Sequence, residues 1–103
     1  MARIKIFWTA TAIKQRNFIF EYWINRNGNR IYISKLNSKI KERIKILSSN
    51  PKSGKTTNYN NTRLLTLGHY SIFYQIYQSQ IIITAFWDNR QDPLKLIEFL
   101  NQK

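Results

Sequence analysis

The sequence predicts an α+β fold in which an N-terminal strand precedes an antiparallel helical hairpin that packs on a mainly antiparallel, twisted sheet, with a short C-terminal helix. Two observations indicate this class. Between residues 12 and 47 the apolar residues recur at intervals of three and four, the spacing of amphipathic helices. From residue 63 to 87 the pattern changes to alternating and continuous apolar runs separated by turns, which is typical of strands. A chain of 103 residues is long enough for one modest core, so residues 1–103 are expected to form one domain.

The first strand and the first helix follow from the N-terminal sequence. In residues 4–8, three apolar side chains stand at alternate positions, which predicts a short strand. Thr9 or Thr11 can cap the following helix, because a threonine oxygen accepts a hydrogen bond from the free N–H groups of the first turn. The sequence NGN at residues 27–29 is a strong turn signal and ends this helix.

A second helix is expected from residue 33, antiparallel to the first because the connecting turn is short. Its apolar residues recur in steps of three and four: Ile33, Leu36, Ile40, Ile44 and Leu47. The other face of this helix carries five basic residues: Lys35, Lys39, Lys41, Arg43 and Lys45. Pro51 ends the helix, since the residue before a proline disfavours the helical conformation.

The next segment predicts a loop and a β-hairpin. Residues 51–61 are polar and basic and are expected to form a loop. Residues 63–67 and 70–77 have strand character, and they flank a Gly-His pair at residues 68–69. A two-residue connection that begins with glycine is suited to a tight hairpin.

The C-terminal part predicts an interior strand and a last helix. After a turn at residues 78–80, residues 81–87 are apolar on both faces, which indicates a strand inside a sheet rather than at its edge. Asp92 can cap a final helix with Pro93 at its first position, where the missing N–H of proline costs nothing.

Composition excludes several classes of protein. Without cysteine there is no disulfide framework and no thiolate metal site, and one histidine with five scattered acids predicts neither a metal nor a cofactor. No apolar run approaches the roughly 18 residues of a membrane-spanning helix. The N-terminus lacks the apolar core of a secretory signal. A soluble, cytoplasmic protein is therefore expected.

Charge is the strongest compositional signal. Seventeen Lys and Arg residues against five Asp and Glu residues give a net charge of +12. Residues 26–63 hold ten of the basic residues against Glu42 alone, whereas residues 64–87 hold no charged Lys, Arg, Asp or Glu. A field of this size attracts polyanions or an acidic protein partner. The alternative interpretation is a solvated helix face in a sequence rich in Lys, Asn and Ile.

Five motifs, which together extend over nearly the whole chain, suggest a family. In chain order they are IFWTATA, EYWINRNG, ILSSNPKSGK, TRLLTLGHYSIFYQI and FWDNRQDP. This arrangement resembles the RelE/ParE superfamily of bacterial type II toxins. The resemblance implies a toxin domain that inhibits growth and forms a hetero-oligomer with a cognate acidic antitoxin, without a cofactor and without a membrane.

The resemblance leaves two toxin activities open. RelE-like members are ribosome-dependent mRNA endoribonucleases that need no metal, whereas ParE-like members poison DNA gyrase by binding it. In the ribonuclease branch, an Arg stands where this chain has Ser71, and a His or Tyr stands where it has Asp88. These departures favour a ParE-like or related mechanism, with the RelE-like ribonuclease as the alternative. A second alternative is a non-toxic basic module that binds nucleic acid.

The end of the last expected strand contains the candidate catalytic residues. The resemblance places Arg90 where the ribonucleases hold a cation against the scissile phosphate, but an ion pair with Asp88 or Asp92 is the competing interpretation. Asp88 can act as a base if burial raises its pKa, or it can cap the turn. His69 is considered as a general base because the ordinary pKa of a histidine side chain lies near neutrality, although a histidine in a tight turn generally faces solvent.

Six residues, His69 among them, are candidates for binding the target or RNA. Arg63 can contact phosphate or a partner, or it can hold the preceding loop in place. The resemblance places Lys52 and Lys55 in a loop whose lysines face RNA, and a solvated loop is the alternative. Tyr70 and Trp87 can stack on bases, although aromatic residues in strands more commonly belong to the core.

Overall fold

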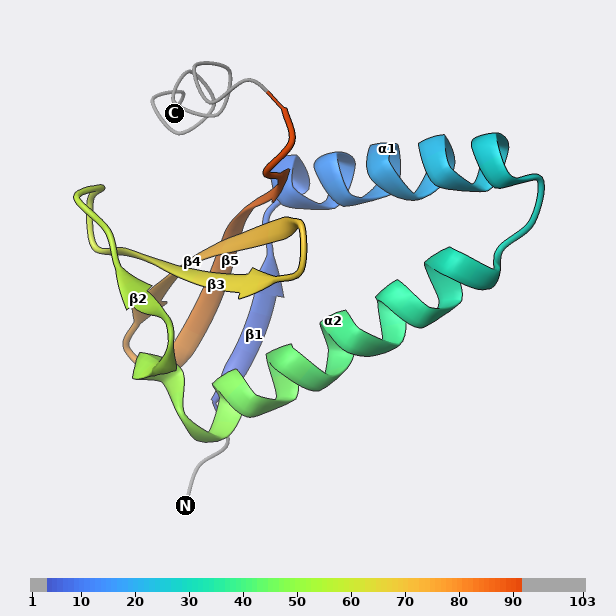
Figure 1. Cartoon of the computed structure of the whole chain (residues 1–103). Coiled ribbons are helices and arrows are strands. Elements are labelled where there is room, and N and C mark those ends of the chain that lie inside the picture. The colour runs from blue at the N-terminus through green and yellow to red at the C-terminus, as the bar shows by residue number, and fades with distance from the viewer. Residues whose placement is uncertain (1–3, 92–103) are drawn as a thin grey trace.

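The computed structural model describes residues 4–91, and the helix expected after Asp92 lies outside them. In chain order the elements are β1 (Lys5–Trp8), α1 (Ala10–Asn27), α2 (Ile31–Ser49), the 3-10 helix η1 (Pro51–Ser53), β2 (Lys55–Thr56), β3 (Thr62–Leu67), β4 (Tyr70–Tyr77) and β5 (Gln80–Asp88). The strands form one sheet in the order β1-β5-β4-β3-β2 (Figure 1). Of the four strand pairs in residues 4–91, only β1–β5 is parallel, which confirms the predicted α+β class and the interior position of β5.

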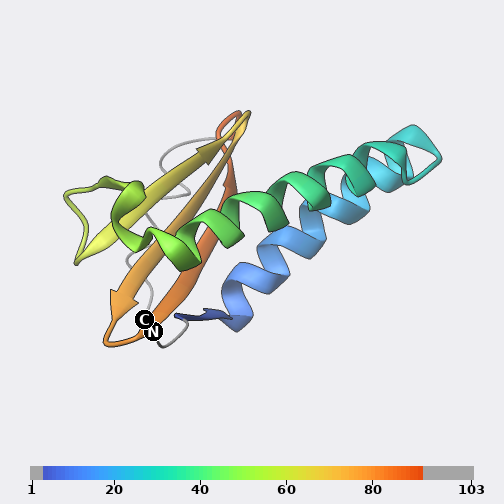
Figure 2. The same ribbon diagram turned by 90° about the horizontal axis from the view of Figure 1, so that it is seen from below.

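The helical hairpin is set by its local sequence. Of the two candidate capping threonines, Thr9 precedes α1, and its Oγ1 accepts a hydrogen bond of 3.1 Å from the N–H of Ala12. At the other end Gly28 adopts a left-handed conformation with φ of 71°, and its N–H donates to the carbonyl of Ile24. The two helices lie over one face of the sheet, and their connecting turn projects beyond the edge of the sheet (Figure 2).

The main core lies between the helices and this face of the sheet. Its buried members come from both helices and from three strands: Ala12, Ile19, Ile33, Leu36, Ile40, Leu47, Leu65, Tyr70, Ile72, Tyr74, Ile81, Ile83 and Phe86. On the opposite face, a smaller cluster contains Phe73, Ala85 and Trp87. The predicted apolar stripe of α2 is thus the stripe that packs on the sheet. Over residues 4–91, no helix is both long and apolar enough to cross a membrane.

A β-bulge interrupts β5 and was not predicted. Tyr74 pairs with Ile83, but the neighbouring Phe73 pairs with Ala85, so Thr84 is an extra residue in β5. Because side chains alternate between the faces of a strand, one extra residue exchanges the two faces for everything that follows it. The bulge therefore turns the last residue of β5, Asp88, toward the face that carries the helices.

The two turns that flank β4 and the segment before β3 complete the fold. The predicted hairpin connection at residues 68–69 is confirmed, with Gly68 at a φ of 60° that suits glycine. Residues 51–61 were expected to form only a loop, and this expectation was incomplete. They include η1 and the short edge strand β2, whose Thr56 pairs with Arg63 of β3.

Candidate functional site

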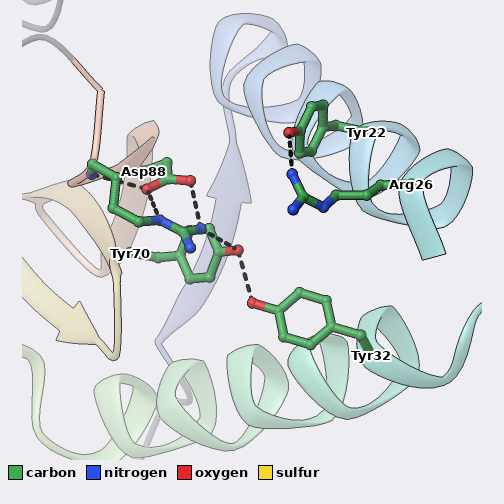
Figure 3. Close-up of polar contacts among 6 residues, drawn as sticks. Tyr22, Arg26, Tyr32, Tyr70 and Asp88 are labelled. Carbon is green, nitrogen blue, oxygen red and sulfur yellow. Dashed lines mark hydrogen bonds and ion pairs between the residues drawn. The ribbon is translucent and has the colours of Figure 1, made fainter.

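Four polar side chains from three parts of the chain meet at the end of β5 (Figure 3). Asp88 ends β5 and pairs in register with Tyr70 at the start of β4, while Tyr32 reaches them from α2. Arg90 follows β5 directly. Its Nε donates to Asp88 Oδ1 at 2.9 Å, and its Nη2 donates to Asp88 Oδ2 at 2.8 Å. The Tyr70 hydroxyl lies 3.4 Å from Arg90 Nη2 and 2.9 Å from the Tyr32 hydroxyl.

The contact between Asp88 and Arg90 combines a turn cap with an ion pair. Besides the two side-chain hydrogen bonds, the backbone N–H of Arg90 donates to Asp88 Oδ1 at 2.9 Å. Burial alone would raise the pKa of the Asp88 carboxyl, but the hydrogen bonds and charge of Arg90 outweigh burial and lower this pKa below 3.8. Because this pKa is lowered rather than raised, the condition under which Asp88 was expected to act as a base is not met, and the turn cap is the contact that Asp88 makes.

Tyr70 and Trp87 are core residues. Only 2% of Tyr70 is exposed, and its ring stacks on Phe86 with 5.5 Å between the centroids. Burial, followed by the hydrogen bond with Tyr32, raises the pKa of the Tyr70 hydroxyl well above its ordinary value, so the phenol stays protonated. Trp87 is 5% exposed and packs in the cluster on the opposite face of the sheet. Neither ring is open for stacking on a base, because both are covered by the fold.

Arg63 holds the segment that precedes the hairpin. Its Nη1 donates to the carbonyls of Lys52 and Gly54 at 3.1 and 2.8 Å. Beside it, the hydroxyl of Tyr74 donates to the carbonyl of Pro51 at 2.7 Å and accepts from the N–H of Gly54 at 2.9 Å. These four bonds satisfy backbone groups that have no place in the sheet ladder. In this structure Arg63 has the contacts of a loop anchor.

The remaining predicted residues are dispersed. Lys52 and Lys55 are exposed on the segment that Arg63 holds, and His69 is exposed in the hairpin turn. Arg63 pairs with Tyr74, four residues along β4 from the partner of Asp88, a separation of about 13 Å at the rise of a strand. The structure thus brings Arg90, Asp88, Tyr70 and the hairpin turn together at one end of the sheet, and Arg63, Lys52 and Lys55 elsewhere.

Ser71 occupies the position at which an Arg was expected for a ribonuclease. It is buried, and its hydroxyl donates to Asn89 Oδ1 at 2.6 Å. Ser71 pairs with Trp87, so it lies on the face of the sheet opposite to Asp88. The Ser71 hydroxyl therefore donates the hydrogen bond that holds the turn after β5 in place.

A groove between α1 and the end of β5 was not predicted. It consists of two adjoining hollows of about 500 and 550 Å³. The residues shared by both hollows are Phe18, Ile19, Asp88 and Gln91. Two large side chains on its α1 side are solvent-exposed, Phe18 at 67% and Tyr22 at 49%. Their spacing of four residues places them on one ridge of α1, which was the available sequence signal.

One end of this groove is cationic. The guanidinium groups of Arg26 and Arg90 lie 5.5 and 5.2 Å from the ring centroid of Trp23. Arg26 Nη1 also donates to the Tyr22 hydroxyl at 3.1 Å (Figure 3). A guanidinium over an aromatic ring is held in place while its free N–H groups remain available to an anion. The arrangement offers an apolar floor with positive charge at one end.

The chain is similar to known proteins in sequence and in fold. A family described as "ParE toxin of type II toxin-antitoxin system, parDE" matches residues 6–93. No curated protein matches the sequence. Among solved structures, a chain from "Chromosomal ParDE TA system from P. aeruginosa" superposes with a TM-score of 0.69 at 22% identity. The match covers 81% of this chain and 92% of that chain, and at this identity it establishes likeness of fold.

Proposed function

Because this chain belongs to the family of ParE toxins of type II toxin–antitoxin systems, we propose that it arrests bacterial growth by binding DNA gyrase rather than by cleaving RNA. The proposal takes residues 1–103 as one toxin domain that acts in the cytoplasm. The observation that carries it is the Asp88–Arg90 pair. The Arg90 guanidinium, which a ribonuclease would turn toward the phosphate, is already hydrogen-bonded to the Asp88 carboxylate.

Cleavage by attack of a 2′-hydroxyl needs a base for the hydroxyl and a free cation for the charge that develops on phosphate. At the end of β5, the lowered pKa of Asp88 makes it a weak base at neutral pH, and the raised pKa of Tyr70 keeps that hydroxyl protonated. Arg90 gives two of its three nitrogens to neighbouring side chains. This constellation supports a binding mechanism.

The groove along α1 supports the proposed binding of an antitoxin. An apolar floor beside Phe18 suits one face of an amphipathic segment, and the cation at Arg26 suits an acidic side chain at its end. We therefore propose that the cognate antitoxin places an acidic, amphipathic segment in this groove and thereby neutralises the toxin. The net charge of +12 would also accelerate the encounter with an acidic protein.

The two activities are separated by assaying one preparation in two reactions. Purified toxin is added to gyrase-catalysed plasmid supercoiling and, in parallel, to translating ribosomes with a defined mRNA. The proposal predicts inhibited supercoiling and intact mRNA. Cleaved mRNA with unaffected supercoiling, and loss of that cleavage in Arg90→Ala, would instead establish the RelE-like alternative. Growth without arrest on expression, together with no effect in either reaction, would favour the non-toxic nucleic-acid-binding module.

The antitoxin proposal is tested with the product of the neighbouring open reading frame. Arg26→Glu places a negative charge in the groove and is expected to weaken binding of that product about tenfold or more, because like charges then face each other. The matched control is Arg30→Glu, which makes the same charge reversal at an exposed residue outside the groove. Equal weakening by both substitutions would show that only net charge matters and would refute the assigned groove.

A further inference from the structure

The solvent-facing side of α2 carries four exposed lysines: Lys35, Lys39, Lys41 and Lys45. Within residues 4–91, the only ion pair joins Arg90 to Asp88, so none of these lysines pairs with a described acid. Glu42 is the only acidic residue in the helix. Figure 2 shows that no described element lies over this side of α2. The result is an uncompensated positive face on a rigid element.

These lysines act against the stability of their own helix. Lys35 and Lys39, like Lys41 and Lys45, are four residues apart and are therefore neighbours on the helix surface, where like charges destabilise. The N-cap residue of the helix, Arg30, makes no side-chain cap and the first turn holds no acidic residue, although Asn29 Oδ1 accepts from the N–H of Ile31. Glu and Lys placed alternately at a spacing of four residues would stabilise the helix, whereas lysines at this spacing destabilise it. The pattern therefore indicates a binding surface for an anion.

The lysines form two rows along α2. At about 100° per residue, the row of Lys35 and Lys39 lies roughly 120° around the helix from the row of Lys41 and Lys45. Ser38 falls between the rows, and so does Glu42. Exposed apolar residues on this side are limited to Ile31, at the start of the helix, and Ile46, near its last turn.

This layout fits duplex DNA better than other polyanions. An α-helix with its side chains is about 10–12 Å wide, and the major groove of B-DNA is about 12 Å wide. Two lysine rows can then reach the phosphates on both sides of the groove, while Ser and Glu face base edges that they can contact. The core of a protein–protein interface is enriched in aromatic residues and depleted in lysine, so an acidic protein fits this surface less well. Single-stranded nucleic acid is bound by aromatic rings on which its bases stack. The major groove of A-form RNA is too narrow for side chains to read.

We propose that α2 is a duplex DNA-binding helix, which enters the major groove with Lys35 and Lys39 on one phosphate backbone and Lys41 and Lys45 on the other. This inference does not rest on gyrase inhibition, because its evidence is the charge and geometry of α2. Gyrase inhibition and DNA binding are measured separately, so either proposal can fail without the other.

The test measures binding of the purified full-length chain to a fluorescent 20-base-pair DNA duplex over a series of salt concentrations. Four phosphate contacts predict a slope of about −3.6 for the logarithm of the association constant against the logarithm of salt concentration. Lys39→Gln combined with Lys45→Gln removes one lysine from each row and is expected to reduce this slope to about −1.8, with an affinity loss of up to about 60-fold at 0.1 M salt.

The matched control combines Lys5→Gln with Lys14→Gln, which removes the same charge from exposed residues outside α2. The control is expected to keep the slope near that of the unmodified chain. The α2 double variant separates both lysine neighbours, so it is expected to be at least as stable to heat as the unmodified chain. If it does not fold, Lys35→Gln with Lys41→Gln removes an equivalent pair and carries the same expectation.

Three results would overturn the proposal. Equal losses in the α2 variant and the control would show that binding depends on net charge alone. Binding of an RNA duplex of the same sequence as tightly as the DNA duplex would contradict a helix fitted to the major groove of B-DNA. Displacement of the DNA by polyglutamate as effectively as by unlabelled duplex of equal charge would assign the face to acidic protein.

Discussion

Replacement of Tyr74 by phenylalanine removes one oxygen atom that connects β4 to the segment before the hairpin. This oxygen donates to the carbonyl of Pro51 at 2.7 Å and accepts from the N–H of Gly54 at 2.9 Å, and the residue is completely buried. Each lost bond costs about 1 kcal/mol net, so Tyr74→Phe is expected to lower the free energy of unfolding by about 2 kcal/mol. For a chain of this size that corresponds to a fall in Tm of roughly 8–16 °C.

Urea unfolding followed by circular dichroism measures this change, and Tyr77→Phe is the matched control. Tyr77 lies in the same strand, but it is 59% exposed, so loss of its hydroxyl is expected to change the free energy of unfolding by less than about 0.5 kcal/mol. Equal effects of the two substitutions would refute the reasoning, because they would show that the buried hydroxyl contributes nothing to holding the segment.

Three other substitutions test the packing and the charges. Gly54→Ala is expected to cost about 1–3 kcal/mol, since the added Cβ would lie 2.5 Å from the Tyr74 hydroxyl, and calorimetry measures the loss. Asp88→Asn removes a carboxyl whose pKa is lower in the folded state than in the unfolded state. The unmodified chain is therefore expected to be the more stable one above about pH 4, and the difference in stability is expected to disappear as pH falls below that. Parallel curves of unfolding free energy against pH for the two proteins would contradict this. Gln15→Met removes the side-chain oxygen that accepts from the N–H of Phe86 at 2.8 Å and is expected to cost about 1 kcal/mol in urea unfolding, whereas an unchanged midpoint would show that the bond contributes nothing.

Local chemistry made the helical hairpin predictable. A capping threonine, a glycine in the left-handed conformation and an apolar stripe each act within a few residues, so the sequence alone displays them. The same holds for the tight turn at residues 68–69. The bulge at Thr84 has no such signal, because threonine suits a regular strand and the register depends on how β4 and β5 pair.

Tertiary contacts explain what could not be predicted of the site. The pairing of Arg90 with Asp88 was among the alternatives that the sequence offered, because the two residues are two positions apart in a turn. The contact of Tyr32 with Tyr70 and the approach of Arg90 to Trp23 depend on how the helices pack on the sheet. Such contacts join residues 38 or more positions apart, and no local pattern records them.

The same limit applies to exposure. Tyr70 was a candidate for stacking on bases because strand patterns place aromatic residues on a face without saying what covers that face. In the structure the helical hairpin covers this face, and the Tyr70 hydroxyl links Arg90 to Tyr32 of α2. Arg63 likewise has a basic side chain that suits phosphate, but in the structure its guanidinium donates hydrogen bonds to backbone carbonyls of the preceding segment.

The claim that this toxin acts by binding gyrase is tested by plasmid supercoiling with purified gyrase and increasing amounts of the purified chain. Supercoiling is expected to fall as the toxin approaches equimolar amounts with gyrase and to recover when the product of the neighbouring open reading frame is added. Undiminished supercoiling at a large excess of a folded toxin that still arrests growth in cells would contradict the claim.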